Sequence, residues 1–263
     1  MEVIQIQNWK HVNDIVESTA QHEMGIGISH IQFRGQADSI WKLDSGLKRI
    51  VQGGEISEEK ARFYEVQVQR EYAAQYHLID EKLAYRPEMH RQAMFIDMQH
   101  FSCPTRVLDW TTSPYVGLYF AIGENFEKDG ALFVWNSGRY NAYMKHRYPS
   151  ILEISPVDVP AFEDYDFVQL LLPEVNNERI VRQQGTFSIS NKILASHCDL
   201  INVPLKWSKI PALQKYIIPS TLKFEFMARL RLMNISASSL FPGMDGLGKS
   251  IKESLLIRKW TRK

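Results

Sequence analysis

The sequence has little cysteine, and its two thiols, Cys103 and Cys198, stand far apart along the chain. Two cysteines cannot build the disulfide framework of a small secreted protein, so a cytoplasmic location is expected. No apolar run approaches the roughly 20 residues that a membrane-spanning helix needs. The first residues also lack the basic and apolar regions of a signal peptide. We therefore expect no membrane association.

A surplus of charge is missing as well. The 31 lysines and arginines nearly balance the 30 aspartates and glutamates, which leaves a net charge of +1. No global field draws such a chain to nucleic acid or to a membrane, although a local basic patch is compatible with this balance. With 44% hydrophobic residues over 263 positions, the chain can build a substantial core. Without repeats or a convincing linker, a single domain is the simpler prediction.

Several common catalytic motifs are absent, including a glycine-rich phosphate loop and a His-Glu-x-x-His helix. His100 with Cys103, and His197 with Cys198, have the residue types of a zinc site. The second pair is adjacent and cannot easily chelate one ion together, so we predict no metal. Cys103 and His100 also have the residue types of a nucleophile and its base. However, a cysteine followed by proline in an apolar setting is typical of an inert buried thiol.

The most informative stretch lies near the middle of the chain. A strand is predicted at Thr105–Trp110, and this apolar segment carries opposite charges on Arg106 and Asp109. Thr112 or Ser113 then offers a helix N-cap, followed by a proline that suits the first helical position. Two interpretations stay open: a buried salt bridge beside a capped helix, or a ligand site at a helix N-terminus.

The remaining segments alternate between strand and helix patterns. Strands are expected at residues 2–7, 26–33, 131–135 and 212–218, and helices at 8–21, 57–76, 87–99, 222–232 and 247–260. Residues 136–178 are the least regular, with a strand possible at 150–154, and residues 179–190 suggest a strand, a glycine-bearing bend and a second strand. These patterns predict an α+β fold, in which a single domain has a central mixed or split sheet surrounded by helices.

Three separated segments share their features with one known family. They are Phe33-Arg34-Gly35-Gln36; the stretch from Gln99-His100 through Pro104-Thr105-Arg106, Leu108-Asp109-Trp110-Thr111 and Ser113-Pro114 to Tyr119-Phe120-Ala121; and Arg182-Gln183-Gln184-Gly185-Thr186-Phe187. Together they resemble the FRG domain family, which is named for the first of them. Trp41, Leu43, Ser45 and Arg49, and the segment Leu240-Phe241-Pro242-Gly243-Met244-Asp245-Gly246, also look like the family. Gly117 stands where the family more often has alanine.

The resemblance covers roughly residues 25–250. It leaves a lead-in strand and helix at 1–24 and a basic helix or tail at 251–263. The order of the motifs is also similar to that of ADP-ribosyltransferases, which implies an ADP-ribosyltransferase-like fold and NAD+ as the substrate. On this resemblance Arg34, Asp109 and Gln184 carry the catalysis. NAD+ is expected to contact Arg34, Gly35, Gln36, Thr111, Ser113, Tyr119 and Gln183.

One feature of the resemblance is unusual, because Gln184 stands where the better-known enzymes use glutamate. Asp109 either supplies the missing carboxylate or is consumed by pairing with Arg34 or Arg106. The function implied is a toxin or effector that transfers ADP-ribose from NAD+ to a macromolecule. The expected acceptor is nucleic acid, with RNA preferred over DNA, and the expected setting is phage defence or a toxin–antitoxin system with an antitoxin protein. The alternative is a non-catalytic module that binds a nucleotide or a protein in the same cleft.

Overall fold

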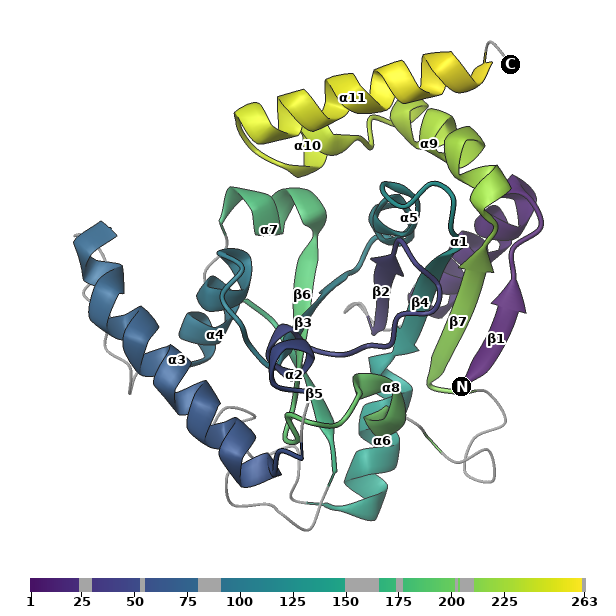
Figure 1. Cartoon of the computed structure of the whole chain (residues 1–263). Coiled ribbons are helices and arrows are strands. Elements are labelled where there is room, and N and C mark those ends of the chain that lie inside the picture. Colours follow the sequence, from purple (N-terminus) through teal and green to yellow (C-terminus); the bar gives the residue numbers. More distant parts are fainter. Residues whose placement is uncertain are drawn as a thin grey trace.

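The computed structural model describes residues 1–23, 30–52, 55–79, 91–149, 166–173, 177–201, 203 and 211–261. Its strands are β1 (Glu2–Gln5), β2 (Ile31–Gln36), β3 (Val107–Thr111), β4 (Gly130–Asn136), β5 (Val168–Leu171), β6 (Gly185–Ser190) and β7 (Leu213–Ile218). They form one sheet in the order β1-β7-β4-β2-β3-β6-β5 (Figure 1). β1 pairs in parallel with β7, and the other neighbours are antiparallel. The predicted mixed central sheet is therefore confirmed.

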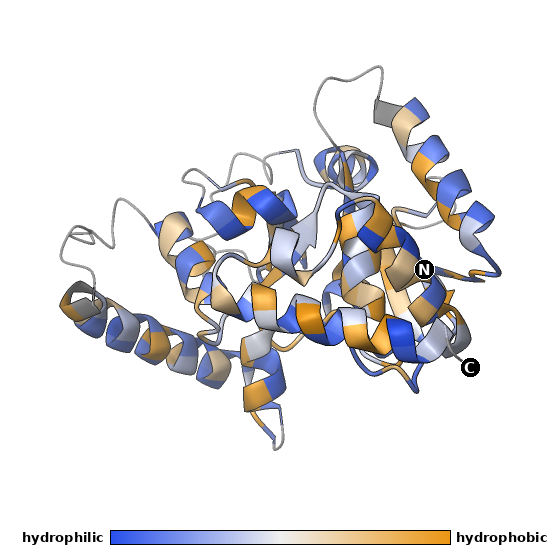
Figure 2. Cartoon of the chain, turned by 90° about the horizontal axis from the view of Figure 1, so that it is seen from above, coloured by the Kyte–Doolittle hydropathy of each residue, from blue (hydrophilic) through white to orange (hydrophobic). Residues whose placement is uncertain are grey.

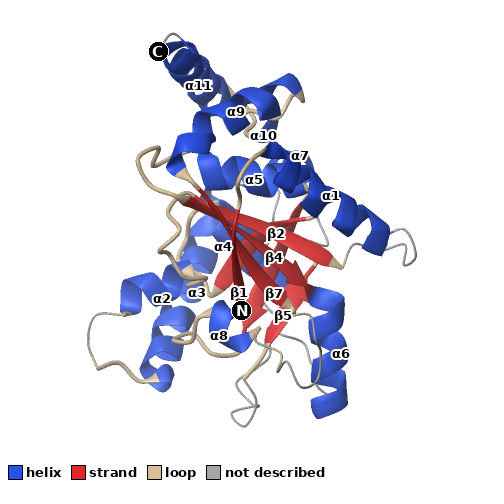
Figure 3. Cartoon of the chain, turned by 90° about the vertical axis from the view of Figure 1, so that its right-hand side faces the viewer, coloured by secondary structure: helices blue, strands red, loops and turns tan. Residues whose placement is uncertain are grey.

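Helices cover both faces of the sheet, as Figure 3 shows. Within the described residues they are α1 (Trp9–Glu23), α2 (Gly46–Val51), α3 (Glu58–Ile79), α4 (Arg91–His100), α5 (Pro114–Ile122), α6 (Ser137–Arg147), α7 (Glu178–Gln183), α8 (His197–Leu200), α9 (Lys223–Leu232), α10 (Ala237–Leu240) and α11 (Met244–Thr261). Alternate strand residues supply the two main cores. Phe33 and Leu132 pack on the side of α5, whereas Phe133 and Trp135 pack on the side of α6.

The strand pairing in the sheet is shortest between β2 and β3. β2 pairs with β4 along its whole length, but it pairs with β3 only where Phe33 faces Thr111. Thr111 in turn faces Gly185 on β6. The three segments that carry the family resemblance therefore meet in one row across neighbouring strands.

Close packing of β2 against α5 explains two glycines. A Cβ atom added at Gly35 would lie 2.0 Å from the carbonyl oxygen of Gly117. One added at Gly117 would lie 2.8 Å from Cβ of Phe33. Both contacts are shorter than a Cβ atom tolerates unless its neighbours shift, so glycine fits both sides of this interface.

The structure corrects some local predictions. Residues 179–183 belong to α7 instead of a strand, because Asn177 caps the helix through its side chain, which accepts a hydrogen bond from the Ile180 N–H at 2.8 Å. Helix α6 occupies the start of the segment that was predicted to be irregular. Strand β2 continues to Gln36, beyond its predicted end at Phe33. The predicted strand at 150–154 and the predicted helix start at 87 lie outside the described residues.

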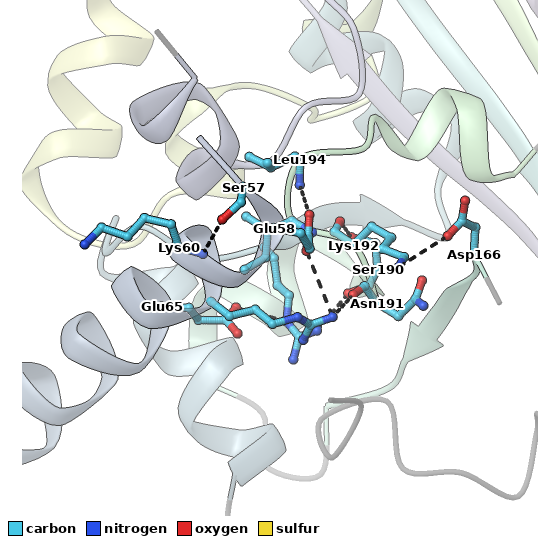
Figure 4. Close-up of polar contacts among 12 residues, drawn as sticks. Ser57, Glu58, Lys60, Glu65, Asp166, Ser190, Asn191, Lys192 and Leu194 are labelled. Atoms are coloured by element: carbon cyan, nitrogen blue, oxygen red, sulfur yellow. Dashed lines mark hydrogen bonds and ion pairs between the residues drawn. The ribbon is translucent and has the colours of Figure 1, made fainter. Parts of the chain in front are cut away.

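Buried and half-buried charges fasten α3 to the end of β6 (Figure 4). The carboxylate of Glu58 accepts a hydrogen bond from the Leu194 N–H at 3.1 Å. Farther along α3, Glu65 pairs with the buried Arg106, and 2.9 Å separates Oε1 from Nε. Arg106 also donates to the Ser190 carbonyl at 3.0 Å. The salt bridge predicted for Arg106 exists, but its partner is Glu65 and not Asp109.

Candidate functional site

A cavity of about 630 Å³ lies at the C-terminal end of β2, between α5, α11 and the chain that leads into α2. Its wall combines basic and aromatic side chains. The basic ones are Arg34, Lys42, Arg49, Lys249 and Lys252, and the aromatic ones are Trp41, Tyr119, Phe120, Phe126 and Phe241. Basic side chains bind phosphate, and aromatic rings stack on flat rings, so the cavity suits an anionic ligand that carries a ring.

Arg34 occupies the gap where β2 and β3 part. Its Nη1 donates to the main-chain carbonyl of Asp109 and lies 3.6 Å from the Asp109 carboxylate. The Arg34 side chain is only 16% exposed. Burial lowers the pKa of Arg34, and the charge of Asp109 opposes this change. The guanidinium therefore replaces the missing strand pairing at this point and keeps a positive charge beside the cavity.

Two buried polar atoms of the first motif lack partners among the described residues. They are Nε of Arg34 and Oε1 of Gln36. The other amide atom of Gln36, Nε2, donates to the Lys42 carbonyl at 3.0 Å and so fixes the side chain. A buried polar atom without a hydrogen bond costs roughly 1–3 kcal/mol. An unpaired donor and an unpaired acceptor on residues that both line the cavity indicate a place for a polar ligand.

Asp109 is engaged by Arg34 and by Gln99. The Gln99 side chain donates to the Asp109 carboxylate at 2.9 Å and accepts a hydrogen bond from Thr105. The Asp109 side chain remains about half exposed and does not figure among the described residues that line the cavity. Its contacts make Asp109 the residue that positions Arg34.

Gln184 lies close to the same edge of the sheet but outside the cavity wall. It ends α7 in the left-handed region, with φ of 47°. Its carbonyl accepts a hydrogen bond from the Thr112 N–H at 3.1 Å, and its side chain lies 3.4 Å from the Thr112 hydroxyl. The exposed carboxamide is not among the described groups that line the cavity. The structure therefore joins Arg34 to Asp109 and leaves Gln184 apart from them.

Three predicted ligand contacts are hydrogen-bonded within the protein. The Thr111 hydroxyl donates to the Gln183 carbonyl at 2.7 Å, and the Gln183 side chain donates to the Leu240 carbonyl at 3.2 Å. The Ser113 hydroxyl caps α5 by accepting from the Val116 N–H at 3.3 Å. These groups fix the start of α5 and tie α7 to α10.

Tyr119 lines the cavity together with Glu253, a buried carboxylate on α11. The Tyr119 hydroxyl donates to Glu253 at 2.6 Å, and the Ala237 N–H donates to its other oxygen at 3.1 Å. Burial and this carboxylate raise the pKa of Tyr119, so the phenol stays protonated and remains a donor. The cavity wall thus holds a buried carboxylate, Glu253, whose two oxygens are fixed by hydrogen bonds.

Lys223 anchors the far end of the cavity. It is fully buried, and its ammonium group donates to the carbonyls of Ala37 at 2.8 Å and of Glu124 and Asn125 at 3.0 Å each. Burial lowers the pKa of Lys223 to about 8. Ala37 and Glu124 line the cavity, so this one side chain holds together β2's extension and the end of α5.

Residues 29–130 match the family model of the FRG domain. The chain carries an FRG domain. The match includes β2 and α5 and therefore two walls of the cavity, whereas α11 lies outside it. No curated protein and no solved structure matches the chain.

Sequence reasoning missed the wall of the cavity that α11 provides. Lys249, Lys252 and Glu253 come from this helix, and the predicted boundary at residue 250 falls inside it. The signal was the segment from Leu240 to Gly246, which directly precedes the helix and resembles the family. Trp41 and Arg49, which also resemble the family, line the cavity as well.

His100 with Cys103 and His197 with Cys198 have the residue types of a zinc site. In the part of the chain that the structure describes, no group of three or more histidine, cysteine or acidic side chains could hold a metal ion. Burial raises the pKa of Cys103, which disfavours the thiolate that a nucleophile requires. His197 is fully buried, and its Nδ1 lies 3.0 Å from the Ser188 hydroxyl. No helix of the described ranges has the length and apolar character to cross a membrane.

Proposed function

We propose that this FRG protein is an ADP-ribosyltransferase-like enzyme that cleaves NAD+ and transfers ADP-ribose to a macromolecule. The observation that carries the proposal is the cavity at the end of β2, where Arg34 and Gln36 meet aromatic side chains and the lysines of α11. NAD+ combines a pyrophosphate with two flat rings, and the wall offers partners for both. The narrow junction between β2 and β3 supports the proposal, because it opens the sheet beside Arg34.

The lining suggests a division of labour. Lys249, Lys252 and Arg34 suit the pyrophosphate, since each is basic and each lines the cavity. Tyr119 and Phe120 suit stacking on a ring. The unpaired acceptor of Gln36 and the unpaired donor of Arg34 match a carboxamide, which has one group of each kind.

In the reaction, the bond between the ribose and the nicotinamide nitrogen breaks, and its electron pair stays with the nicotinamide. A nucleophilic oxygen or nitrogen of the acceptor forms the new bond to the same ribose carbon and releases its proton. Positive charge develops on the ribose between these events, and a fixed carboxylate stabilises it. We assign this role, and receipt of the acceptor's proton, to Glu253, because it is the buried carboxylate of the cavity wall. Gln184 carries no charge and cannot supply this stabilisation.

The acceptor that we propose is nucleic acid, with RNA first, in phage defence or as the toxin of a pair that includes an antitoxin protein. The support is the set of basic side chains at the cavity, including Lys42 before α2 and Arg49 within it. The balanced charge of the whole chain adds nothing to this choice.

The test is release of free nicotinamide from NAD+, with and without RNA, DNA or protein as acceptor. Wild-type protein is expected to release nicotinamide, and Arg34→Lys to lose at least about 100-fold in rate, because lysine keeps the charge but not the fork that reaches Asp109. Lys259→Ala is the control, since this basic residue of α11 is exposed and is not among the described groups of the cavity wall. Circular dichroism would verify that both variants fold.

The competing function is a binding module. Its support is the position of Asp109, which is engaged by Arg34 and Gln99 and holds no place in the cavity wall as described. If the protein binds ADP-ribose saturably but releases no nicotinamide from NAD+ with any acceptor, the binding module is the correct function and the enzyme is not.

A further inference from the structure

Helix α11 exposes a stripe of large apolar side chains to solvent, which is unusual for a helix that only covers a core. Its inward face carries Gly246, Ser250, Glu253 and Ile257. The first three are buried, and Ile257 is partly buried against the core. Its outward face carries Met244, Leu247, Ile251 and Leu255, which are 46–79% exposed. A surface helix normally turns its apolar stripe to the core. Figure 2 looks down on this side of the molecule and shows hydrophobic residues along α11.

The orientation of α11 is fixed by specific contacts, so the helix cannot simply roll over. A Cβ atom at Gly246 would lie 2.0 Å from the Phe241 carbonyl, which shows how closely the helix approaches the chain before it. Arg231 donates to the Ser250 hydroxyl at 3.2 Å, and Glu253 accepts from α5 and α10. Turning the apolar face inward would break all of these contacts.

We infer that the outward face of α11 is a docking surface for an acidic amphipathic helix of a partner protein. The stripe of Met244, Leu247, Ile251 and Leu255, spaced three or four residues apart, fits the apolar face of another helix. The charged side chains beside this stripe determine which charge a partner helix should carry. Lys252, Arg258 and Lys259 are exposed on α11, whereas Lys249 turns to the cavity, where its Nζ lies 4.6 Å from the centre of the Phe241 ring. The exposed acid on this helix is Asp245 at its start. Glutamates on the flanks of a partner helix would complement them.

The same charges disfavour pairing of two copies of this chain through α11, because like charges would then face one another across the seam. They also place the partner beside the cavity, since Lys252 belongs both to α11 and to the cavity wall. A partner helix seated on α11 would therefore lie at the edge of the candidate site. This inference does not depend on the proposed chemistry.

The experiment measures fluorescence anisotropy with two labelled helical peptides about as long as α11. Both carry leucines on one face, and one has glutamates on its flanks where the other has lysines. The full-length protein is expected to bind the acidic peptide and to bind it less as salt is raised. The variant Ile251→Ser/Leu255→Ser is expected to weaken binding at least about tenfold. Its control is Ile50→Ser/Leu78→Ser, which removes two equally exposed apolar side chains from α2 and α3.

A melting temperature of both variants close to that of the wild type would show that the fold is intact. Lack of saturable binding of the acidic peptide up to about 100 µM would overturn the inference. So would equal binding of both peptides, or a loss of binding in the control variant that matches the loss in the α11 variant. If the α11 substitutions abolish self-association of the protein but not peptide binding, the surface binds a second copy. If they abolish binding to phosphatidylglycerol vesicles but not peptide binding, the surface binds a membrane.

Discussion

At the scale of single residues, a buried chain of hydrogen bonds surrounds His197, and its burial determines the protonation state of the ring. Trp110 Nε1 donates to the Ser188 hydroxyl at 2.7 Å, and 3.0 Å separates that oxygen from Nδ1 of His197. The Ser188 hydroxyl therefore joins the Trp110 and His197 rings in one buried hydrogen-bonded chain. Burial lowers the pKa of His197 from its ordinary value of 6.5 to about 3. The ring is therefore neutral in the folded protein.

This depressed pKa predicts a loss of stability in mild acid. The unfolded chain protonates His197 near 6.5, and the folded protein does so only near 3, so the unfolded state binds one more proton between these values. Stability from this group is full above 6.5 and falls as the pH drops toward 3. From about pH 7.5 to about pH 5 the loss should be about 2 kcal/mol.

Urea denaturation of the wild type and of His197→Asn at both pH values measures this effect. Asparagine keeps an acceptor for Ser188 and removes the titration, so its stability deficit relative to the wild type should shrink by about 2 kcal/mol at the lower pH. A deficit that is the same at both pH values would show that His197 is protonated equally in the two states.

At the scale of secondary structure, the sequence identifies the long elements and confuses the short ones. The capping serine before α3 and the proline that opens α5 predict those helices correctly, since caps are local signals. The six residues of α7 offer less than two turns of periodicity, so a β-branched pattern resembles a strand. What decides their state is the Asn177 cap and the tertiary contacts of Gln183, which a single sequence does not display.

Helix α11 illustrates the same limit for the candidate site. Arg34, Gly35 and Gln36 could be identified because they form a contiguous motif that resembles the FRG domain family, whereas an arginine before a glycine at a strand end is a weak signal alone. Glu253 could not, because its burial depends on Tyr119 and Ala237, which are remote in the sequence. The sequence predicted only a basic helix or tail at residues 251–263, and nothing local showed that the small residues of α11 face the domain.

Two glycines of α11 provide a matched test of this docking. Ala at position 246 would place its Cβ 2.0 Å from the Phe241 carbonyl, whereas position 248 has no atom within 4 Å. Gly246→Ala should therefore lower the free energy of unfolding by roughly 2–3 kcal/mol or more. Gly248→Ala should raise it by up to about 1 kcal/mol, because alanine favours the helix. Urea denaturation measures both, and equal effects would mean that α11 is not packed as described.

At the scale of the whole molecule, the cavity is assembled from parts that are far apart along the chain. β2 brings Arg34, α5 brings Tyr119 and Phe120, and α11 brings the lysines and Glu253. Two of these parts belong to the segment that matches the FRG domain, and the third follows it. The C-terminal helices are therefore needed to complete the site, and the protein must be tested as a full chain.

This assembly predicts that ADP-ribose stabilises the whole fold through α11. At about 100 times its dissociation constant, a ligand that binds only the folded state adds about 2.7 kcal/mol, which corresponds to a rise in Tm of roughly 5–10 °C. Lys249→Glu/Lys252→Glu should reduce this rise at least threefold, since both lysines line the cavity and suit the pyrophosphate.

The control, Arg258→Glu/Lys259→Glu, makes the same change in charge on the same helix at exposed positions that are not among the described cavity residues. It should keep nearly the full rise in Tm, because only the local geometry of Lys249 and Lys252 matters. Differential scanning fluorimetry over a series of ADP-ribose concentrations measures all three proteins. If both double variants lose the effect equally, the lysines act through net charge alone and α11 is not a wall of the ligand site.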